Sequence, residues 1–284
     1  MESTFSHPPL ADLSIVTLAP NLPGPVAVRR LADWGATVVK VESPEGDSLR
    51  AYARDYYREL HEGVDVRTLD LKSDAGQAAL STLLEDAALL VTAQRPAALK
   101  RLGLDFANIR RLWPHLSQLA IVGHAPPDED FAGHDLTYIA NAGLLQPPAL
   151  PPTLMADLLG AERAVSETLL LLLRARESGR GEYSQVALTD AATVLAAPWR
   201  HGLTRPGGLL GGAHPGYRLY RTADGWLALA ALEPHFLTRL VASLGIAEPD
   251  SAALARAFAA QPDAWWRDFA LRYDVPLVVL PAGA

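Results

Sequence analysis

Residues 1–200 alternate short apolar stretches rich in β-branched residues with longer stretches whose apolar positions recur at helical spacing. The apolar stretches predict strands at residues 13–18, 36–41, 67–71, 88–92, 116–122 and 184–188. The intervening stretches predict helices at residues 26–34, 74–85, 104–112, 161–176 and 190–199. Strands that alternate with helices favour parallel crossover connections. This part of the chain therefore predicts an α/β fold with a Rossmann-like, doubly wound parallel sheet.

The composition changes at residues 205–215, where Pro-Gly-Gly and Gly-Gly occur with few charged residues. Two apolar stretches follow, at residues 217–220 and 226–231, and Thr-Ala-Asp-Gly separates them. Asp-Gly between apolar stretches is typical of a β-hairpin. We therefore expect a large domain at 1–200, a linker at 201–216 and a small α+β domain at 217–284.

Charge and residue usage exclude several classes of function. The formal net charge is −7, without the basic excess of a nucleic-acid-binding protein. There is no cysteine, which excludes disulfides, thiolate metal sites and cysteine nucleophiles. The first ten residues lack the pattern of a secretory signal, and the longest apolar run, at 169–173, is too short to cross a bilayer. We expect a cytoplasmic protein that binds a small molecule, with neither nucleic acid nor membrane as a partner.

Familiar catalytic motifs are missing from the sequence. It has no phosphate-binding loop, no Gly-x-Gly-x-x-Gly after the first strand, no paired-histidine metal motif and no Gly-x-Ser-x-Gly elbow. His134 and Asp157 remain as candidates near turns. Asp157 comes just before the helix predicted at 161–176, where the helix dipole favours a carboxylate. From position alone, Asp157 fits a helix N-cap and His134 a structural role at least as well as catalysis.

Several ordered motifs resemble those of the family III CoA-transferases, which include formyl-CoA transferase, carnitine CoA-transferase and α-methylacyl-CoA racemase. They are Leu22-Pro-Gly-Pro25, Leu31-Ala-Asp-Trp-Gly-Ala-Thr-Val-Val-Lys-Val-Glu-Ser-Pro44, Leu69-Asp-Leu-Lys-Ser73 and Arg95-Pro96 with Arg101-Leu-Gly-Leu104. The order and spacing match through residue 236, and more loosely to about residue 281. The resemblance implies that Lys72, Arg95 and Arg101 bind CoA, and that no cofactor is needed beyond the CoA of the substrate.

Two segments are similar to the racemase branch of that family. One is Gly133-His134-Asp135 with Tyr138 and Gly143, and the other is Ala230-Ala-Leu-Glu-Pro-His-Phe236. The resemblance implies that His134 and Asp157 are the catalytic acid–base pair and that Glu233 orients or tunes His134. A Glu233 that is merely a solvated turn carboxylate before Pro234 is an equally open interpretation.

Racemisation of a 2-methylacyl-CoA needs such a pair. One group removes the weakly acidic α-proton while the enolate oxygen is stabilised, and a second group returns a proton on the opposite face. Neutral His134 and protonated Asp157 can exchange these roles. Amides at the start of the helix near Leu158 are the expected enolate stabilisers.

Two alternatives stay open. Asp157 could instead attack an acyl-CoA carbonyl as the nucleophile of a CoA-transferase, through a mixed anhydride. The chain could also be a diverged, non-catalytic binding protein, since Glu62, Val64 and Asp65 replace basic residues expected near the CoA phosphates. The family resemblance implies a homodimer. Full interlocking is not expected, because the family's C-terminal returning segment has no counterpart in this sequence.

Overall fold

The computed structural model describes residues 7–281, which form two compact units that divide between Ala196 and Ala197. The predicted linker at 201–216 therefore belongs to the second unit, as does the end of the predicted large domain.

The first unit is built on a sheet of six parallel strands in the order β3-β2-β1-β4-β5-β6. The strands are β1 (Ser14–Thr17), β2 (Thr37–Glu42), β3 (Asp65–Thr68), β4 (Leu89–Thr92), β5 (Ser117–Val122) and β6 (Tyr183–Ala187). This is the strand order of a doubly wound Rossmann sheet, so the predicted fold class is confirmed. Every residue of the interior strands β4 and β5 is buried, as expected for strands covered on both faces.

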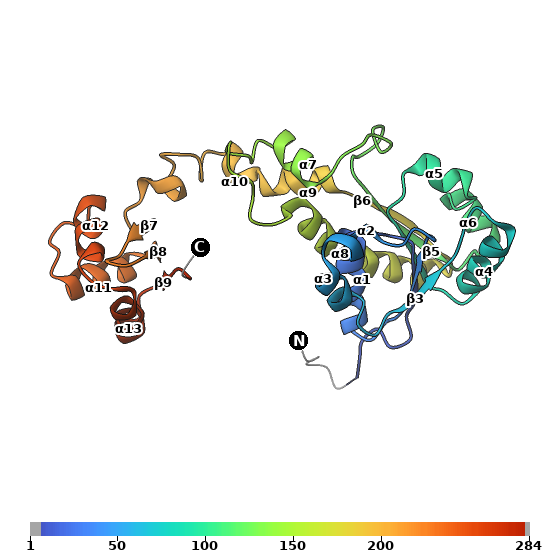
Figure 1. Cartoon of the computed structure of the whole chain (residues 1–284), viewed down its shortest axis with the longest axis horizontal. Helices are drawn as coiled ribbons and strands as arrows, with labels where there is room; N and C mark the ends of the chain where they lie inside the picture. Colours follow the sequence, from blue (N-terminus) through green and yellow to red (C-terminus); the bar gives the residue numbers. More distant parts are fainter. Residues whose placement is uncertain (1–6, 282–284) are drawn as a thin grey trace. The chain divides into compact units, whose positions relative to one another are not determined.

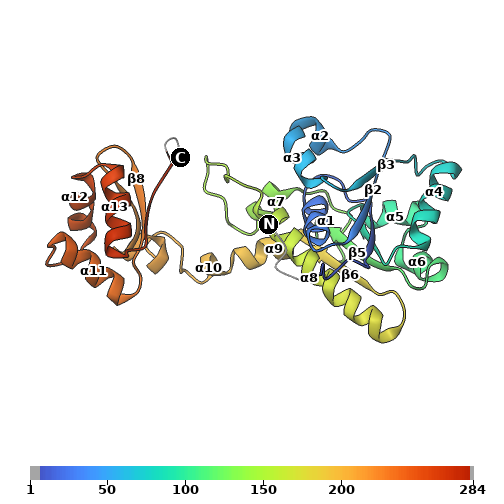
Figure 2. The same ribbon diagram turned by 90° about the horizontal axis from the view of Figure 1, so that it is seen from below.

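Helices cover both faces of this sheet (Figures 1 and 2). The helices of the unit are α1 (Pro23–Asp33), α2 (Ser48–Tyr52), α3 (Arg54–Leu60), α4 (Asp74–Glu85), α5 (Pro96–Arg101), α6 (Phe106–Leu112), α7 (Asp135–Asn141), α8 (Met155–Ser178) and α9 (Leu188–Leu195). One core joins the sheet to α1, α7, α8 and α9, and another joins it to α4, α5 and α6. Through Leu49, Tyr57 and Leu60, α2 and α3 pack on Leu22 near the carboxyl end of β1.

The sequence pattern predicts none of the helices α2, α3, α5 and α7, and two of its element boundaries also differ clearly from the structure. The strand expected at 67–71 is β3 at Asp65–Thr68, a largely exposed edge strand without a clear apolar pattern. The long helix α8 begins at Met155, six residues before its predicted start. The second difference changes the interpretation of the candidate site.

The second unit is a small α+β structure, as predicted. Its strands β7 (Tyr217–Arg221), β8 (Trp226–Ala230) and β9 (Leu277–Val279) form an antiparallel sheet, and β7 and β8 are the hairpin expected from Asp-Gly. The helices are α10 (Ala197–Arg200), α11 (Pro234–Leu244), α12 (Ser251–Ala259) and α13 (Asp263–Tyr273), with a π-helical turn η1 (Leu209–Ala213). Its own core contains Phe258, Trp266 and Phe269. Throughout the described part of the chain, every helix is too short or too polar to span a membrane.

Candidate active site

A cavity of about 220 Å³ opens at the carboxyl edge of the parallel sheet. From β1 the chain winds to β2 and β3 on one side, and β4 to β6 lie on the other. Doubly wound folds bind ligands in the crevice at this switch point. His134 and Asp157 both line the cavity, together with Asn21 and Tyr138. The structure therefore brings the two residues singled out in the sequence to one site.

Asp157 lies inside the first turn of α8, because the N-cap of that helix is Leu154. The interpretation of Asp157 as an N-cap, placed before a helix starting at 161, is wrong. Its backbone N–H donates to Asp135 Oδ1 at 3.0 Å, and the N–H of Leu158 donates to the carbonyl of Leu154 at 3.1 Å. These two helix amides are already engaged, so the expectation that amides near Leu158 stabilise an enolate does not hold for them.

The Asp157 carboxyl group is buried, with 8% of the residue exposed. Burial, followed by the negative charge of Asp135, raises the pKa of Asp157 from 3.8 to about 7. Both the protonated and the ionised forms of Asp157 are therefore populated near neutral pH. A group with this property can donate or accept a proton at little cost.

His134 is the N-cap residue of α7, where its backbone N–H donates to Thr137 Oγ1 at 3.0 Å. It is exposed, and it lines both this cavity and an adjoining one of about 240 Å³. Tyr138, one turn later, is buried and lines the same two cavities. Burial raises its pKa to about 12, so the phenol stays protonated.

Glycines leave room for the Tyr138 ring. A Cβ on Gly133 would lie 2.3 Å from Tyr138 Cε1, and one on Gly123 would lie 2.4 Å from the hydroxyl oxygen. No side chain can be added at either position without moving the ring. The sequence between β5 and α7 is therefore fitted to hold this phenol at the cavity.

Of the three residues expected to bind CoA, Arg95 and Lys72 line cavities next to the one at Asp157. Arg95 is exposed and lines the 240 Å³ cavity with His134. Lys72 is exposed and lines a third cavity, of about 360 Å³, which shares Pro20 with the cavity at Asp157. Arg101, in the last turn of α5, is exposed and lines none of these three cavities as the described residues form them.

Glu233 belongs to the second unit, where it is the exposed N-cap residue of α11 directly before Pro234. Its side chain makes no capping hydrogen bond. Its role beside His134 stays a prediction.

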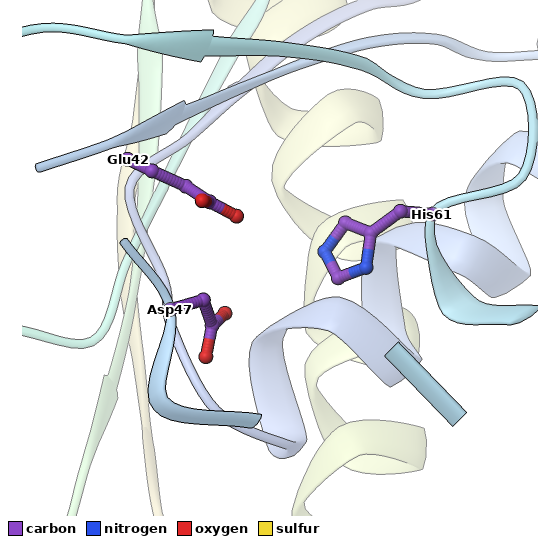
Figure 3. A group of neighbouring side chains, drawn as sticks. All are labelled: Glu42, Asp47 and His61. Atoms are coloured by element: carbon purple, nitrogen blue, oxygen red, sulfur yellow. The ribbon is translucent and has the colours of Figure 1, made fainter. Parts of the chain in front are cut away.

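A buried polar cluster lies at the end of β2. One carboxylate oxygen each from Glu42 and Asp47 and one ring nitrogen of His61 lie within 4.8 Å of one another, and atoms of these kinds can coordinate metal ions (Figure 3). The Lys40 ammonium lies among them: it forms an ion pair with Asp47, is 2.7 Å from His61 Nε2 and 3.3 Å from Glu42 Oε1. A metal ion could bind here only by displacing this buried cation, so the geometry favours an internal lysine site over a metal site.

The histidine of this cluster is neutral. His61 Nδ1 lies 2.6 Å from the carbonyl oxygen of Tyr57, which can only accept, so Nδ1 carries the proton and Nε2 accepts from Lys40. Burial lowers the pKa of His61, which agrees with this assignment.

Sequence reasoning missed Asn21, Lys40 and Asp47. A lysine within the apolar strand Thr37–Glu42 was the available signal, because a buried lysine needs an anionic partner. Asn21 offered only a weak signal, as a residue that tolerates left-handed backbone.

The profile of CoA-transferase family III matches residues 10–274, so the chain belongs to this family. Members of the family act on acyl-CoA thioesters. The resemblance found in the sequence motifs is therefore confirmed.

Its relatives include transferases and racemases. The succinate–glutarate CoA-transferase of Agrobacterium fabrum is 32% identical over 268 residues, which cover 84% of this chain and 67% of the relative. The α-methylacyl-CoA racemase of Homo sapiens is 29% identical over 255 residues, covering 84% of this chain and 65% of the relative. The chain thus spans about two thirds of the length of these curated relatives.

Solved structures agree on the fold. The protein Rv3272 of Mycobacterium tuberculosis superposes with a TM-score of 0.84 at 24% identity, over 96% of this chain and 84% of that one. A CaiB/BaiF family protein from Brucella suis gives a TM-score of 0.81 at 24% identity, over 97% of this chain and 84% of that one.

Proposed function

We propose that the protein epimerises a 2-methylacyl-CoA thioester by 1,1-proton transfer between His134 and Asp157. The observation that carries the proposal is the shared cavity, in which an exposed imidazole accompanies a buried carboxyl group with a pKa of about 7. A two-base racemase needs two proton-transfer groups beside one substrate carbon, and an imidazole and a carboxyl group are side chains that serve this role.

The reaction proceeds in two proton transfers. Neutral His134 removes the α-proton, and the electron pair of the broken C–H bond moves into the thioester carbonyl to form an enolate. Protonated Asp157 then delivers its proton to the opposite face of the α-carbon, which gives the other epimer. Both groups afterwards return to their starting forms by exchanging protons with solvent, so the α-position acquires solvent hydrogen.

Deuterium incorporation tests the proposal. The purified protein is incubated with 2-methylacyl-CoA thioesters of several chain lengths in deuterated water, and the mass of each thioester is followed. We expect one deuterium at the α-carbon with the wild-type protein. We expect the conversion of one pure epimer into the other to fall at least about a hundredfold with Asp157→Asn and with His134→Gln. No incorporation by the wild-type protein into any of the thioesters would rule the proposal out.

A second candidate is acyl transfer between CoA and a carboxylic acid, with Asp157 as the nucleophile. It is supported by relatives such as the Agrobacterium fabrum CoA-transferase, which is 32% identical to this chain. Such a mechanism passes through an acyl-enzyme anhydride, which hydroxylamine traps as a hydroxamate on the carboxylate. Modification of Asp157 that requires both acyl-CoA and hydroxylamine would favour transfer. Full transfer activity in Asp157→Ala would exclude it.

A further inference from the structure

Asn21 has an unusual backbone conformation at the cavity wall. With Asp274, it is one of two non-glycine residues in the range 7–281 that have a positive φ, and its value is 69°. Asparagine tolerates this left-handed conformation better than other side chains, but the conformation is still unfavourable relative to extended or helical backbone. Surrounding contacts must therefore hold Asn21 in place.

The buried cluster supplies those contacts. The backbone N–H of Asn21 donates to both carboxylate oxygens of Asp47, at 3.0 and 3.1 Å. Asp47 also accepts the N–H of Leu49 at 2.9 Å, capping α2, and forms the ion pair with Lys40. The side chains of Asp47 and Lys40 are 0% and 1% exposed, so solvent does not weaken this pair. The Lys40–Asp47 pair thus fixes the backbone of a residue 26 positions from Asp47 in the chain.

The side chain of Asn21 is oriented as well. The hydroxyl of Tyr52 donates to Asn21 Oδ1. A carboxamide also carries two N–H donors on Nδ2, and these have no hydrogen-bond partner within the described residues. An oriented neutral donor therefore belongs to a residue that lines the same cavity as Asp157 and His134.

Proton removal needs such a donor. The thioester oxygen gains negative charge as the α-proton leaves, and a preorganised N–H lowers the barrier more than any contact made equally with the ground state. The amides of Asp157 and Leu158 are already engaged. Because the carboxamide is neutral, it adds no charge that would favour one protonation state of His134 or Asp157 over the other.

We propose that Asn21 Nδ2 donates a hydrogen bond to the thioester oxygen as it becomes the enolate. Lys40 and Asp47 are the positioning residues that hold Asn21 in its left-handed conformation. This inference rests on the proposed function, since it assigns a group to the oxygen of the same substrate.

Replacing Asn21 with glycine or alanine separates the backbone from the carboxamide. Glycine adopts positive φ freely, whereas alanine does not. We expect Asn21→Gly to unfold at or above the wild-type temperature and Asn21→Ala to unfold about 3 °C below it. Equal unfolding temperatures for the two variants would overturn the positioning half of the proposal.

The rate of α-deuterium incorporation tests whether the Asn21 carboxamide stabilises the enolate. Both variants lack the carboxamide, so kcat for α-deuterium incorporation should fall about tenfold or more, while KM changes less than about threefold. Wild-type kcat in Asn21→Gly would overturn the role of the carboxamide. The variant Tyr138→Phe is the matched comparison, because a larger loss there with none in Asn21→Gly assigns the oxygen to the phenol instead.

Asp47→Asn tests the link between the cluster and the cavity. Alone it should lower kcat, whereas in the Asn21→Gly background, where the positioned group is gone, it should lower kcat little further. Equal losses in both backgrounds would mean that Asp47 acts only on general stability. A wild-type protein without any exchange refutes the proposed function and the donor role with it, while the unfolding comparison still decides the positioning of Asn21.

Discussion

Replacing Asp157 with asparagine removes a buried group that must ionise as the pH rises. The pKa of Asp157 is raised from 3.8 to about 7 in the folded protein. Between these values the folded protein binds more protons than the unfolded chain, so the free energy of unfolding falls as the pH increases. The difference is about three pKa units at about 1.4 kcal/mol each, or about 4 kcal/mol over the whole window. Asparagine does not titrate, so the free energy of unfolding of Asp157→Asn does not fall for this reason as the pH rises.

Urea unfolding of the wild-type protein and Asp157→Asn measures the effect. Relative to wild type, the variant should gain about 3 kcal/mol in unfolding free energy between pH 5 and pH 8, and little above that. Asp128→Asn is the control, because it makes the same substitution at an exposed position. A constant difference for Asp157→Asn across this range would refute the reasoning that burial raises the pKa of this group.

Three further results are expected. For the epimer from which Asp157 removes the proton, the exchange rate should rise with pH through about 7, because only the ionised carboxylate acts as a base; a rate for this epimer that stays constant or falls across this range would contradict it. Because Glu62 and Asp65 replace basic residues near the expected phosphate position, a pantetheine thioester should show a KM within about tenfold of the CoA thioester, and a hundredfold increase would contradict it. Lys40→Met should lower the unfolding free energy by about 3–5 kcal/mol in urea titrations, because it leaves the buried Asp47 carboxylate without its cation. Adding Asp47→Asn should restore part of the loss, and a loss below about 1 kcal/mol would contradict the assigned ion pair.

Local sequence pattern was sufficient for the interior strands and the longer helices of the first unit, but not for the short helices α2, α3, α5 and α7. The central strands are largely apolar because both faces are covered, and α4 starts directly after Ser73, which caps it. The edge strand β3 carries no such signal, since three of its four residues are exposed. Its predicted position was therefore two residues late.

The start of α8 and the fixing of Asn21 depend on contacts between distant segments. The N-cap Leu154 has no capping side chain, and Asp135, 22 residues earlier, accepts the N–H of Asp157 instead. Asn21 is held by Asp47, 26 residues later. Patterns of neighbouring residues cannot reveal such pairs. The positions of His134 and Asp157 came from family motifs, and only the structure showed that they share a cavity.

The central claim is that His134 and Asp157 serve opposite faces of one α-carbon. Separate deuterium-incorporation measurements on the R and S epimers of a 2-methylacyl-CoA test it most directly. His134→Gln should retain exchange with only one epimer, and Asp157→Asn should retain exchange with only the other. Variants that both exchange the two epimers at wild-type rates, or that both favour the same epimer, would contradict the account.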